Sequence, residues 1–340
     1  SVTVRTTLSE AVRVPNINEA FAPTFAATIG AGQDPCNQNL IDAGSEFREA
    51  NCIALIGQSV ADGTYDSTQF LSAFVAGTTG GNPNLNPEEA ETLTVGVVWN
   101  PDGEFGGMLD DLVVTVDYYN IEIDGLIDSL TGFQIAQNCV DAPTINNVFC
   151  DAVQRDATNG FITDFQSGFI NLAAVETAGI DFRVDYGFNL EDIVSSANGR
   201  LNLTLNGTHF TKNDETRDVS APDEITDVLG TFTRPEWIVN MRADYLIGDF
   251  VFGWRGRYEG DQLLPGIENQ DIESNPDFIN ITSTGSAFVH DFSVSWGFTE
   301  NMELYGGVNN AFAEDPFLGT LSRPAGPRGR FYYMGLNMTL

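Results

Sequence analysis

The chain has 340 residues and combines 15 Lys and Arg with 48 Asp and Glu, which gives a formal net charge of −33. This acidity excludes an unspecific nucleic-acid binder, which needs a basic surface to neutralise phosphates. No run of about 20 apolar residues exists, so transmembrane helices are excluded, and the length predicts either two soluble domains or one large barrel.

Alternation of apolar and polar residues, the pattern of a β-strand, runs through most of the sequence. In segment 112–124 the alternation changes phase, because Ile121 and Ile123 are apolar where polar residues are expected. This predicts a bulge near Tyr118 and Tyr119. No amphipathic helix of consequence is expected, and the fold class is all-β. The segments predict about ten strands, at 2–8, 93–99, 112–124, 180–188, 201–206, 237–245, 250–258, 288–298, 302–308 and 332–340.

Short and long connections alternate along the chain. In an antiparallel meander alternate connections share one end, so all short turns should lie at one end of the sheet and all long loops at the other. This sorting is typical of an outer-membrane β-barrel, whereas a soluble sandwich has no reason for it. The short connections are 100–110, 189–198, 247–249 and 299–301, and the long ones are 15–88, 127–170, 212–231, 262–286 and 313–329.

The free-energy cost of placing a charged side chain in lipid shows which face of the strands is expected to line the lumen. An arginine that faces lipid near the bilayer midplane costs roughly 2 to 4 kcal/mol, so the polar face is expected to line the lumen. The opposite face carries aromatic residues near strand ends, as interfacial girdles require, with His290 as a polar intruder. The girdle candidates are Trp237, Tyr245, Trp254, Tyr258, Trp296 and Phe298, and the lumen candidates are Arg183, Arg242, Arg255 and Arg257.

The lumen arginines have two interpretations. Their guanidinium forks could hold carboxylates of a ligand in bidentate pairs. Pairing with Asp181, Asp185 and Asp244 on neighbouring strands is the more ordinary alternative for most of them.

Four cysteines fall in two close pairs, Cys36 with Cys52 and Cys139 with Cys150, each inside a polar stretch between predicted strands. Neither pair has the spacing of a zinc site or of a thioredoxin-like motif. We therefore predict two disulfides, each within one long loop, in an oxidising compartment.

Catalytic and metal-binding motifs are missing from the sequence. His209 and His290 are the only histidines, which is too few for a histidine-based triad or zinc site to be expected, so no enzyme is expected. Segment 120–125 mimics the start of a calcium loop, but Thr131 stands where the bidentate Glu belongs. No cofactor is expected, although the acidic stretches 214–227 and 259–277 could recruit calcium or steer a cationic ligand; solubility in a saline habitat is the ordinary explanation.

Several segments resemble, in the correct order, landmarks of TonB-dependent outer-membrane receptors. The landmarks are 13–21 (RVPNINEAF), 81–88 (GNPNLNPE) followed by Glu91-Thr92, 116–119 (VDYY), Asn171 with 179–181 (GID), 308–312 (VNNAF) and 329–333 (GRFYY). The resemblance implies that residues 1–340 are the C-terminal portion of a barrel of about 22 strands, without its plug domain and N-terminal strands.

The resemblance also implies a function. The protein would lie in the outer membrane of a Gram-negative cell, among outer-membrane lipids, with its long loops extracellular. It would capture a bulky scarce nutrient, either an oligosaccharide or other organic nutrient or a ferric siderophore. Import would use energy from the TonB–ExbB–ExbD complex acting through the plug, whose carboxylates the lumen arginines could also hold.

Loop aromatic residues could offer a stacking surface to such a nutrient, unless they only pack their own loops. The candidates are Phe21, Phe25, Tyr65, Phe149 and Phe317. Two alternatives stay open, a passive outer-membrane porin and a secreted β-rich binding module.

Overall fold

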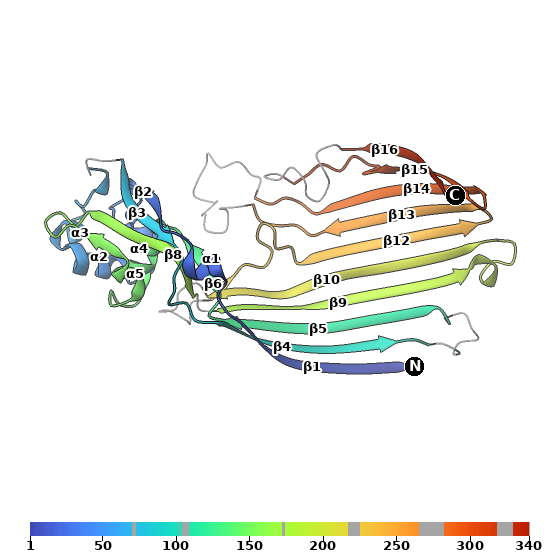
Figure 1. The fold of residues 1–340 in the computed structure, drawn as a ribbon, viewed down its shortest axis with the longest axis horizontal. Coiled ribbons are helices and arrows are strands. Elements are labelled where there is room, and N and C mark those ends of the chain that lie inside the picture. The colour runs from blue at the N-terminus through green and yellow to red at the C-terminus, as the bar shows by residue number, and fades with distance from the viewer. Residues whose placement is uncertain are drawn as a thin grey trace.

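The structure, a computed structural model, contains two separate β-sheets (Figure 1). A long sheet runs along the molecule, and a smaller sheet gathers with the helices at one end of it. The structure describes residues 1–69, 73–101, 103, 109–171, 174–216, 225–264, 282–317 and 329–339.

The long sheet is antiparallel throughout, and β1 and β16 lie at its two open edges. Its ten ordered strands confirm the number expected from alternation, within the described residues. In spatial order they are β1 (Val2–Arg13), β4 (Glu88–Trp99), β5 (Leu112–Asp124), β9 (Ala174–Asn189), β10 (Arg200–Thr216), β12 (Trp237–Ile247), β13 (Phe250–Glu259), β14 (Ala287–Thr299), β15 (Met302–Asn309) and β16 (Phe331–Met338), with short β11 (Thr226–Asp227) beside β10.

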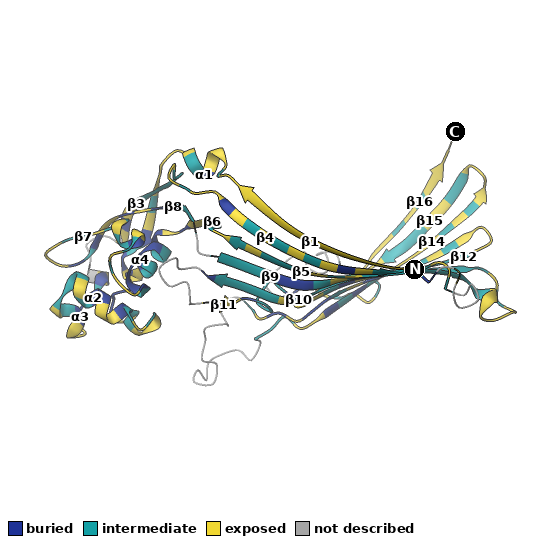
Figure 2. Ribbon diagram, turned by 90° about the horizontal axis from the view of Figure 1, so that it is seen from below, coloured by how far each residue is buried: buried dark blue, intermediate teal, exposed yellow. Residues whose placement is uncertain are grey.

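The connections sort as the sequence predicted. The turns from β9 to β10, β12 to β13 and β14 to β15 lie together at one end of the sheet, and the smaller sheet lies at the other (Figure 1). Figure 2 shows that the long sheet is strongly twisted and curved. Several predicted strand boundaries were wrong: β1 continues to Arg13, β4 begins at Glu88, β9 begins at Ala174 and β10 continues to Thr216. Lys212 therefore lies in a strand, where it pairs with Glu176 at 2.6 Å.

The bulge predicted near Tyr118 and Tyr119 is also wrong. The ladders that join β5 to β4 and to β9 keep a single register along the whole strand. Ile121 and Ile123 therefore share a face with Tyr119, the face opposite Tyr118. Beyond Tyr118 the face that carries Leu112, Val114 and Val116 continues with Asn120, Glu122 and Asp124, so the apolar residues change face while the register stays the same. Register shifts occur instead at Phe210/Lys212 in β10 and at Gly297/Thr299 in β14.

The first two long connections fold together into one unit, which we call the loop domain (residues 15–69, 73–87 and 125–171). Its sheet has the order β2-β3-β8-β6, with β7 on β8 and with β3 and β8 parallel. Its elements are α1 (Ile17–Phe21), β2 (Phe25–Gly30), α2 (Arg48–Ile56), α3 (Gln58–Ala61), β3 (Phe74–Gly80), β6 (Ile127–Leu130), α4 (Gly132–Asp141), α5 (Val148–Asp151), β7 (Val153–Arg155) and β8 (Ile162–Asn171).

Helices α2 and α4 correct the expectation that no helix of consequence exists. Thr131 and Gln134 form a reciprocal capping box at the start of α4, which satisfies backbone donors that an uncapped helix leaves free. The buried side of α4 includes Ile135 and Val140, which pack in the core of the loop domain. Both helices are short and stand in Asn- and Gly-rich sequence, so their periodicity is masked by turn residues.

The loop domain has its own core, and Figure 2 shows buried residues among its helices. Phe165 lies under two glycines: a Cβ built on Gly77 or on Gly132 would come within 2.5 Å or 2.2 Å of its ring. These glycines let β3 and α4 close over the ring. A second buried cluster contains Cys36, Cys52, Cys139 and Phe149.

Candidate functional site: the inner face of the sheet and the loop domain

The polar side chains of the long sheet share one face, which we call the inner face; the opposite, apolar side is the outer face. Two adjoining hollows of about 420 Å³ and 390 Å³ lie on the inner face. Asn206 and Asn240 line both hollows. The first is also lined by Arg242, Arg255, Arg257 and Asp291, and the second by Asp117, Asp181, Arg183 and Thr208.

Most inner-face arginines hold a neighbouring carboxylate. Arg183 Nε donates to Asp185 Oδ2 at 2.5 Å, and Arg242 pairs with Asp244 two residues along its own strand. Arg183 and Arg242 therefore do pair with Asp185 and Asp244, but each pair lies within one strand and not across neighbouring strands as expected. Asp181 is not an arginine partner, since it accepts a hydrogen bond from Thr208 at 2.5 Å.

Arg255 and Arg257 differ from these two. No described carboxylate lies within ion-pair distance of either guanidinium, and both side chains are exposed. Arg255 stands directly opposite Arg242 in the β12–β13 ladder, and it faces Asp291 in the β13–β14 ladder. The Asp291 carboxylate is engaged elsewhere, because Asn310 N donates to it at 2.7 Å.

The outer face carries aromatic residues in two groups. One group, toward the short turns, stacks Phe250 on Trp296 with ring centroids 5.7 Å apart. The other, toward the long loops, stacks His209 on Trp237 at 3.9 Å. His290, the polar intruder, accepts a hydrogen bond at Nδ1 from Trp254 Nε1 at 3.1 Å, so its polarity is satisfied within the face. Two aromatic groups that flank an apolar band are the arrangement of membrane girdles.

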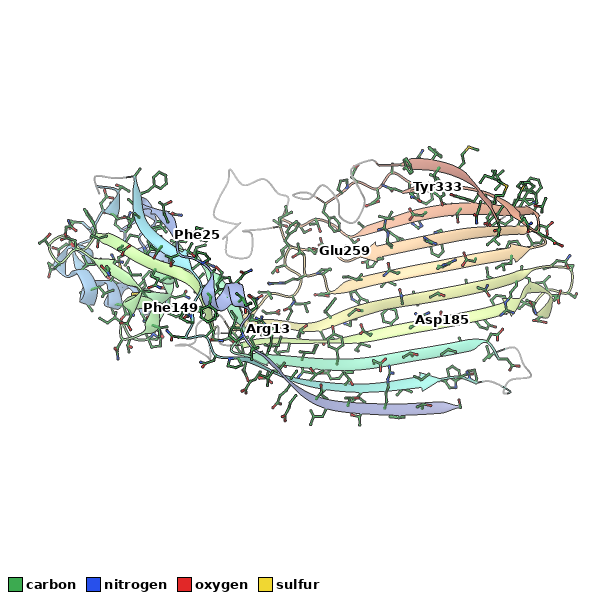
Figure 3. The ribbon with its side chains drawn as sticks, in the orientation of Figure 1. Arg13, Phe25, Phe149, Asp185, Glu259 and Tyr333 are labelled. Carbon is green, nitrogen blue, oxygen red and sulfur yellow. A yellow bond between two sulfur atoms is a disulfide. The ribbon has the colours of Figure 1, made fainter. Side chains whose placement is uncertain are left out.

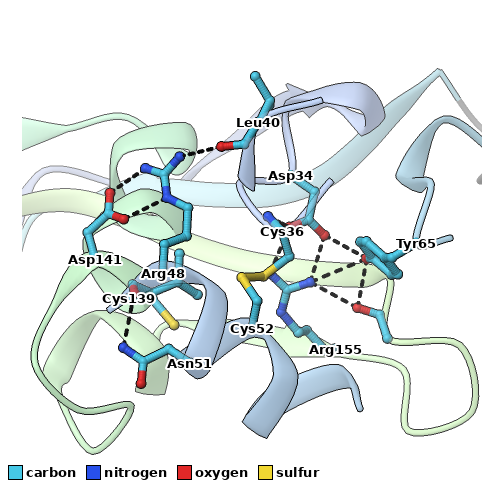
Figure 4. Close-up of a disulfide and its surroundings, with 12 residues drawn as sticks. Asp34, Cys36, Leu40, Arg48, Asn51, Cys52, Tyr65, Cys139, Asp141 and Arg155 are labelled. Carbon is cyan, nitrogen blue, oxygen red and sulfur yellow. Dashed lines mark hydrogen bonds and ion pairs between the residues drawn. A yellow bond between two sulfur atoms is a disulfide. The ribbon is translucent and has the colours of Figure 1, made fainter. Parts of the chain in front are cut away.

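Inside the loop domain a buried ion pair joins its two connections (Figure 4). Arg155 donates to both Asp34 oxygens, at 2.6 Å and 2.9 Å, and the Tyr65 hydroxyl donates to the same carboxylate at 2.8 Å. Burial raises the pKa of Tyr65 well above its ordinary value, and the Asp34 charge raises it further. The hydroxyl therefore stays a hydrogen-bond donor.

A second pair joins helices α2 and α4 (Figure 4). Arg48 is buried; it pairs with Asp141 and donates to the Leu40 carbonyl at 2.8 Å. Asn51 donates to the carbonyls of Val140 and Ala142. The structure contains the disulfides Cys36–Cys52 and Cys139–Cys150, the pairings expected from the sequence.

A junction between the loop domain and the long sheet was missed from the sequence. Arg13 pairs with Glu88 and donates to Glu19 at 3.0 Å, so it ties the end of β1 to the start of β4 and to α1. Figure 3 places Arg13 where the two parts meet. Asn171 joins the junction by donating to the Asn86 carbonyl at 3.0 Å. The motifs 13–21 and 81–88 thus form this junction together. Their charged residues, Arg13, Glu19 and Glu88, were the sequence feature that could have predicted it.

The loop aromatics fall into two classes. Phe21 and Phe25 are 70% and 61% exposed and can present a ring to a ligand; Phe25 projects from β2 (Figure 3). Tyr65, Phe149 and Phe317 are buried, so they pack the interior and are not a stacking surface. Aromatic residues in polar, Gly-rich sequence look exposed, and only tertiary packing shows otherwise.

The calcium-loop candidate at 120–125 is wrong, whereas the acidic stretches stay an untested prediction. Residues 120–124 lie within β5, so they cannot wrap a cation as a loop does. No cluster of three or more potential metal ligands occurs in the part of the chain that the structure describes. Much of both acidic stretches, at 217–224 and 265–281, lies outside the described residues. Among the described residues, none of the helices combines the length and apolar character needed to cross a membrane.

Comparison with known proteins gives one family and two instructive structures. The family described as TonB dependent receptor-like, beta-barrel matches residues 1–311. A mutant of the ferric enterobactin receptor PfeA from Pseudomonas aeruginosa aligns with a TM-score of 0.56 and 14% identity, over 100% of this chain and 38% of that one. The siderophore receptor PirA from Acinetobacter baumannii gives 0.55 and 13%, over 100% and 39%.

No curated protein matches the chain. At these identities the likeness to the two solved structures shows the fold, and the chain spans less than two fifths of their length.

Proposed function

The chain belongs to the β-barrel family of TonB-dependent receptors, and from this membership we propose that it forms part of the wall and mouth of an outer-membrane nutrient importer. The observation that carries the proposal is the sorting of the sheet. Its outer face is apolar with two aromatic groups, its inner face is polar, and the two long connections that form the loop domain lie together at one end. A secreted binding module would have no use for an apolar outer face of this extent.

We place the loop domain on the outside of the cell, because barrels of this class have short periplasmic turns and long extracellular loops. The two disulfides leave no free cysteine in the chain, so an introduced cysteine gives a clean probe. Ala61→Cys in the exposed surface of the loop domain should react with a membrane-impermeant maleimide on intact cells. Asp249→Cys, in the short turn before β13, is the matched control and should react only after lysis.

For the substrate we propose a bulky scarce nutrient that the long connections capture. The named functions of the two similar structures, a ferric enterobactin receptor and a siderophore receptor, make ferric siderophores the first class to test, with oligosaccharides as the second. Exposed Phe21 and Phe25 offer ring faces for stacking to either class. Competition between labelled and unlabelled candidates for binding to cells that carry the full-length receptor identifies the class.

Energy would come from TonB with ExbB and ExbD, acting through a plug domain of the full-length protein. This follows from the family, which is one of transport receptors; no covalent chemistry is proposed for this chain. Uptake measured with and without a proton-motive-force uncoupler tests it. Import should stop when the uncoupler is added, while surface binding persists. Undiminished import would show a passive porin instead.

A further inference from the structure

Arg255 and Arg257 stand out because neither forms an ion pair with any carboxylate that the structure describes, although the chain is rich in carboxylates. Their side chains lie on the same face, two residues apart on β13, which is roughly 7 Å. The other described cations mostly hold a carboxylate: these are Arg5, Arg13, Arg48, Arg155, Arg183, Arg200, Lys212, Arg234 and Arg242. Among the described arginines and lysine only Arg330, just before β16, shares their lack of an ion pair.

Three arginines lie close together here, and of these only Arg242 has its charge compensated by a described carboxylate, that of Asp244. Arg242 is the direct cross-strand neighbour of Arg255, and like charges placed opposite each other destabilise a sheet. Asp291, the carboxylate across the other ladder, is oriented by the Asn310 backbone N–H and does not pair with Arg255. Arg255 and Arg257 thus keep uncompensated positive charges among the described residues, although the whole chain has a net charge of −33.

The neighbouring groups complete a receptive surface. Asn240 lies opposite Arg257, and Thr204 and Asn206 continue the same wall on β10. All of them line the hollow of about 420 Å³, so the guanidinium forks border an open space. Guanidinium binds carboxylate in bidentate pairs, and the amide and hydroxyl groups beside it can donate to further oxygens.

We propose that Arg255 and Arg257, with Asn240 beside them, form a carboxylate-binding site on the inner wall. The inference rests on the proposed function only in taking the inner face as a receptor lumen. Two sources can supply the carboxylate: a segment of the full-length receptor outside residues 1–340, or a soluble ligand in the lumen. The chemistry is the same for both, and the experiment distinguishes them.

The test uses the full-length receptor with Arg257→Lys, because Lys212 is the only lysine in residues 1–340 and background coupling from this part of the receptor is therefore low. A carbodiimide joins an amine to a carboxylate in direct contact, and peptide mass mapping identifies the product. A cross-link from position 257 to a segment outside residues 1–340 assigns the site to the receptor itself. A citrate adduct at position 257, in excess over any at Lys212, assigns it to a soluble carboxylate.

The matched control is Arg183→Lys, which lies in the same cross-strand row as Arg257 but belongs to a satisfied ion pair. It should cross-link to Asp185 and take up no citrate. For Arg257→Lys, a cross-link to a carboxylate within residues 1–340, or no product at all, overturns the proposal.

A second measurement needs no substitution and covers the case in which the variant fails to fold. Phenylglyoxal modifies accessible, unpaired arginines. In the unaltered receptor, Arg255 and Arg257 should be protected from the start by a receptor segment, or lose their modification when citrate is added. Free modification that citrate does not change overturns the proposal. Neither result bears on the uncoupler experiment, so the two proposals can fail separately.

Discussion

Arg155 and Asp34 are 121 positions apart in the chain, yet they form the most buried ion pair of the loop domain. Removing one partner of such a pair leaves a charge without compensation in a dry interior. Asp34→Ala should therefore destabilise the loop domain by about 3 to 5 kcal/mol, measured by hydrogen exchange or limited proteolysis of the full-length receptor. Asp164→Ala, an exposed carboxylate of β8, is the control and should change stability by less than about 0.5 kcal/mol. Equal effects of the two variants would contradict the assignment.

Tyr65 gives a prediction about pH. Its pKa is raised first by burial and then by the Asp34 charge, from a reference of 10.0. A raised pKa in the folded state means that the contribution to stability is complete below the unfolded value and is lost as pH rises beyond it. The loop domain should lose stability above about pH 10, and Tyr65→Phe should weaken that dependence. Tyrosinate absorbance during an alkaline titration, compared between the two proteins, measures it.

The residues differ in how far the sequence reveals them. Inner-face arginines were identifiable because alternation fixes the face of each side chain. The sequence could not show which of these arginines forms an ion pair. Arg183 pairs with Asp185 and Arg255 pairs with no described carboxylate, and this difference depends on side-chain directions. Buried Tyr65 and Phe149 were indistinguishable from exposed Phe25, because all three stand in loop-like sequence.

At the scale of elements, the two disulfides fasten helices to neighbouring segments. Cys36–Cys52 fixes the start of the first connection to α2, and Cys139–Cys150 fixes α4 to α5. Closing loops with separations of 16 and 11 residues contributes roughly 3 kcal/mol each in the chain-entropy model. Replacing Cys139 and Cys150 together by Ser should lower loop-domain stability by that amount and leave the long sheet folded.

Non-reducing peptide mapping of the unaltered receptor checks the pairing itself. A link from Cys52 to Cys139 would contradict the arrangement of both connections.

Strands were predictable where one face is apolar and the other polar, and this covers nearly all of the long sheet. The smaller sheet was not, because its strands are short and are held by contacts between two distant connections. Ser167 of β8, for example, donates to the Thr78 carbonyl of β3, 89 residues away. Local pattern contains no information about such a parallel pairing.

At the scale of the whole molecule, β1 and β16 form open edges of the long sheet. Unpaired backbone groups are not tolerated in lipid, so residues 1–340 expressed alone should not form a closed barrel. Size-exclusion chromatography in detergent and heat-modified gel mobility should show aggregates or mixed species. A monodisperse, heat-resistant barrel from this chain would refute the expectation that it is the C-terminal portion of a larger one.

The construction of the loop domain from two connections has a consequence for biogenesis. Its core joins residues that flank the β4–β5 hairpin, so this shared core can form only when both connections lie on the same side of the membrane. In an outer-membrane barrel we therefore expect the hairpin to enter the membrane as a unit before Arg155 reaches Asp34. We expect the loop domain to fold late, only after the hairpin has inserted correctly. Any exchange of loops between receptors would therefore have to transfer both connections together.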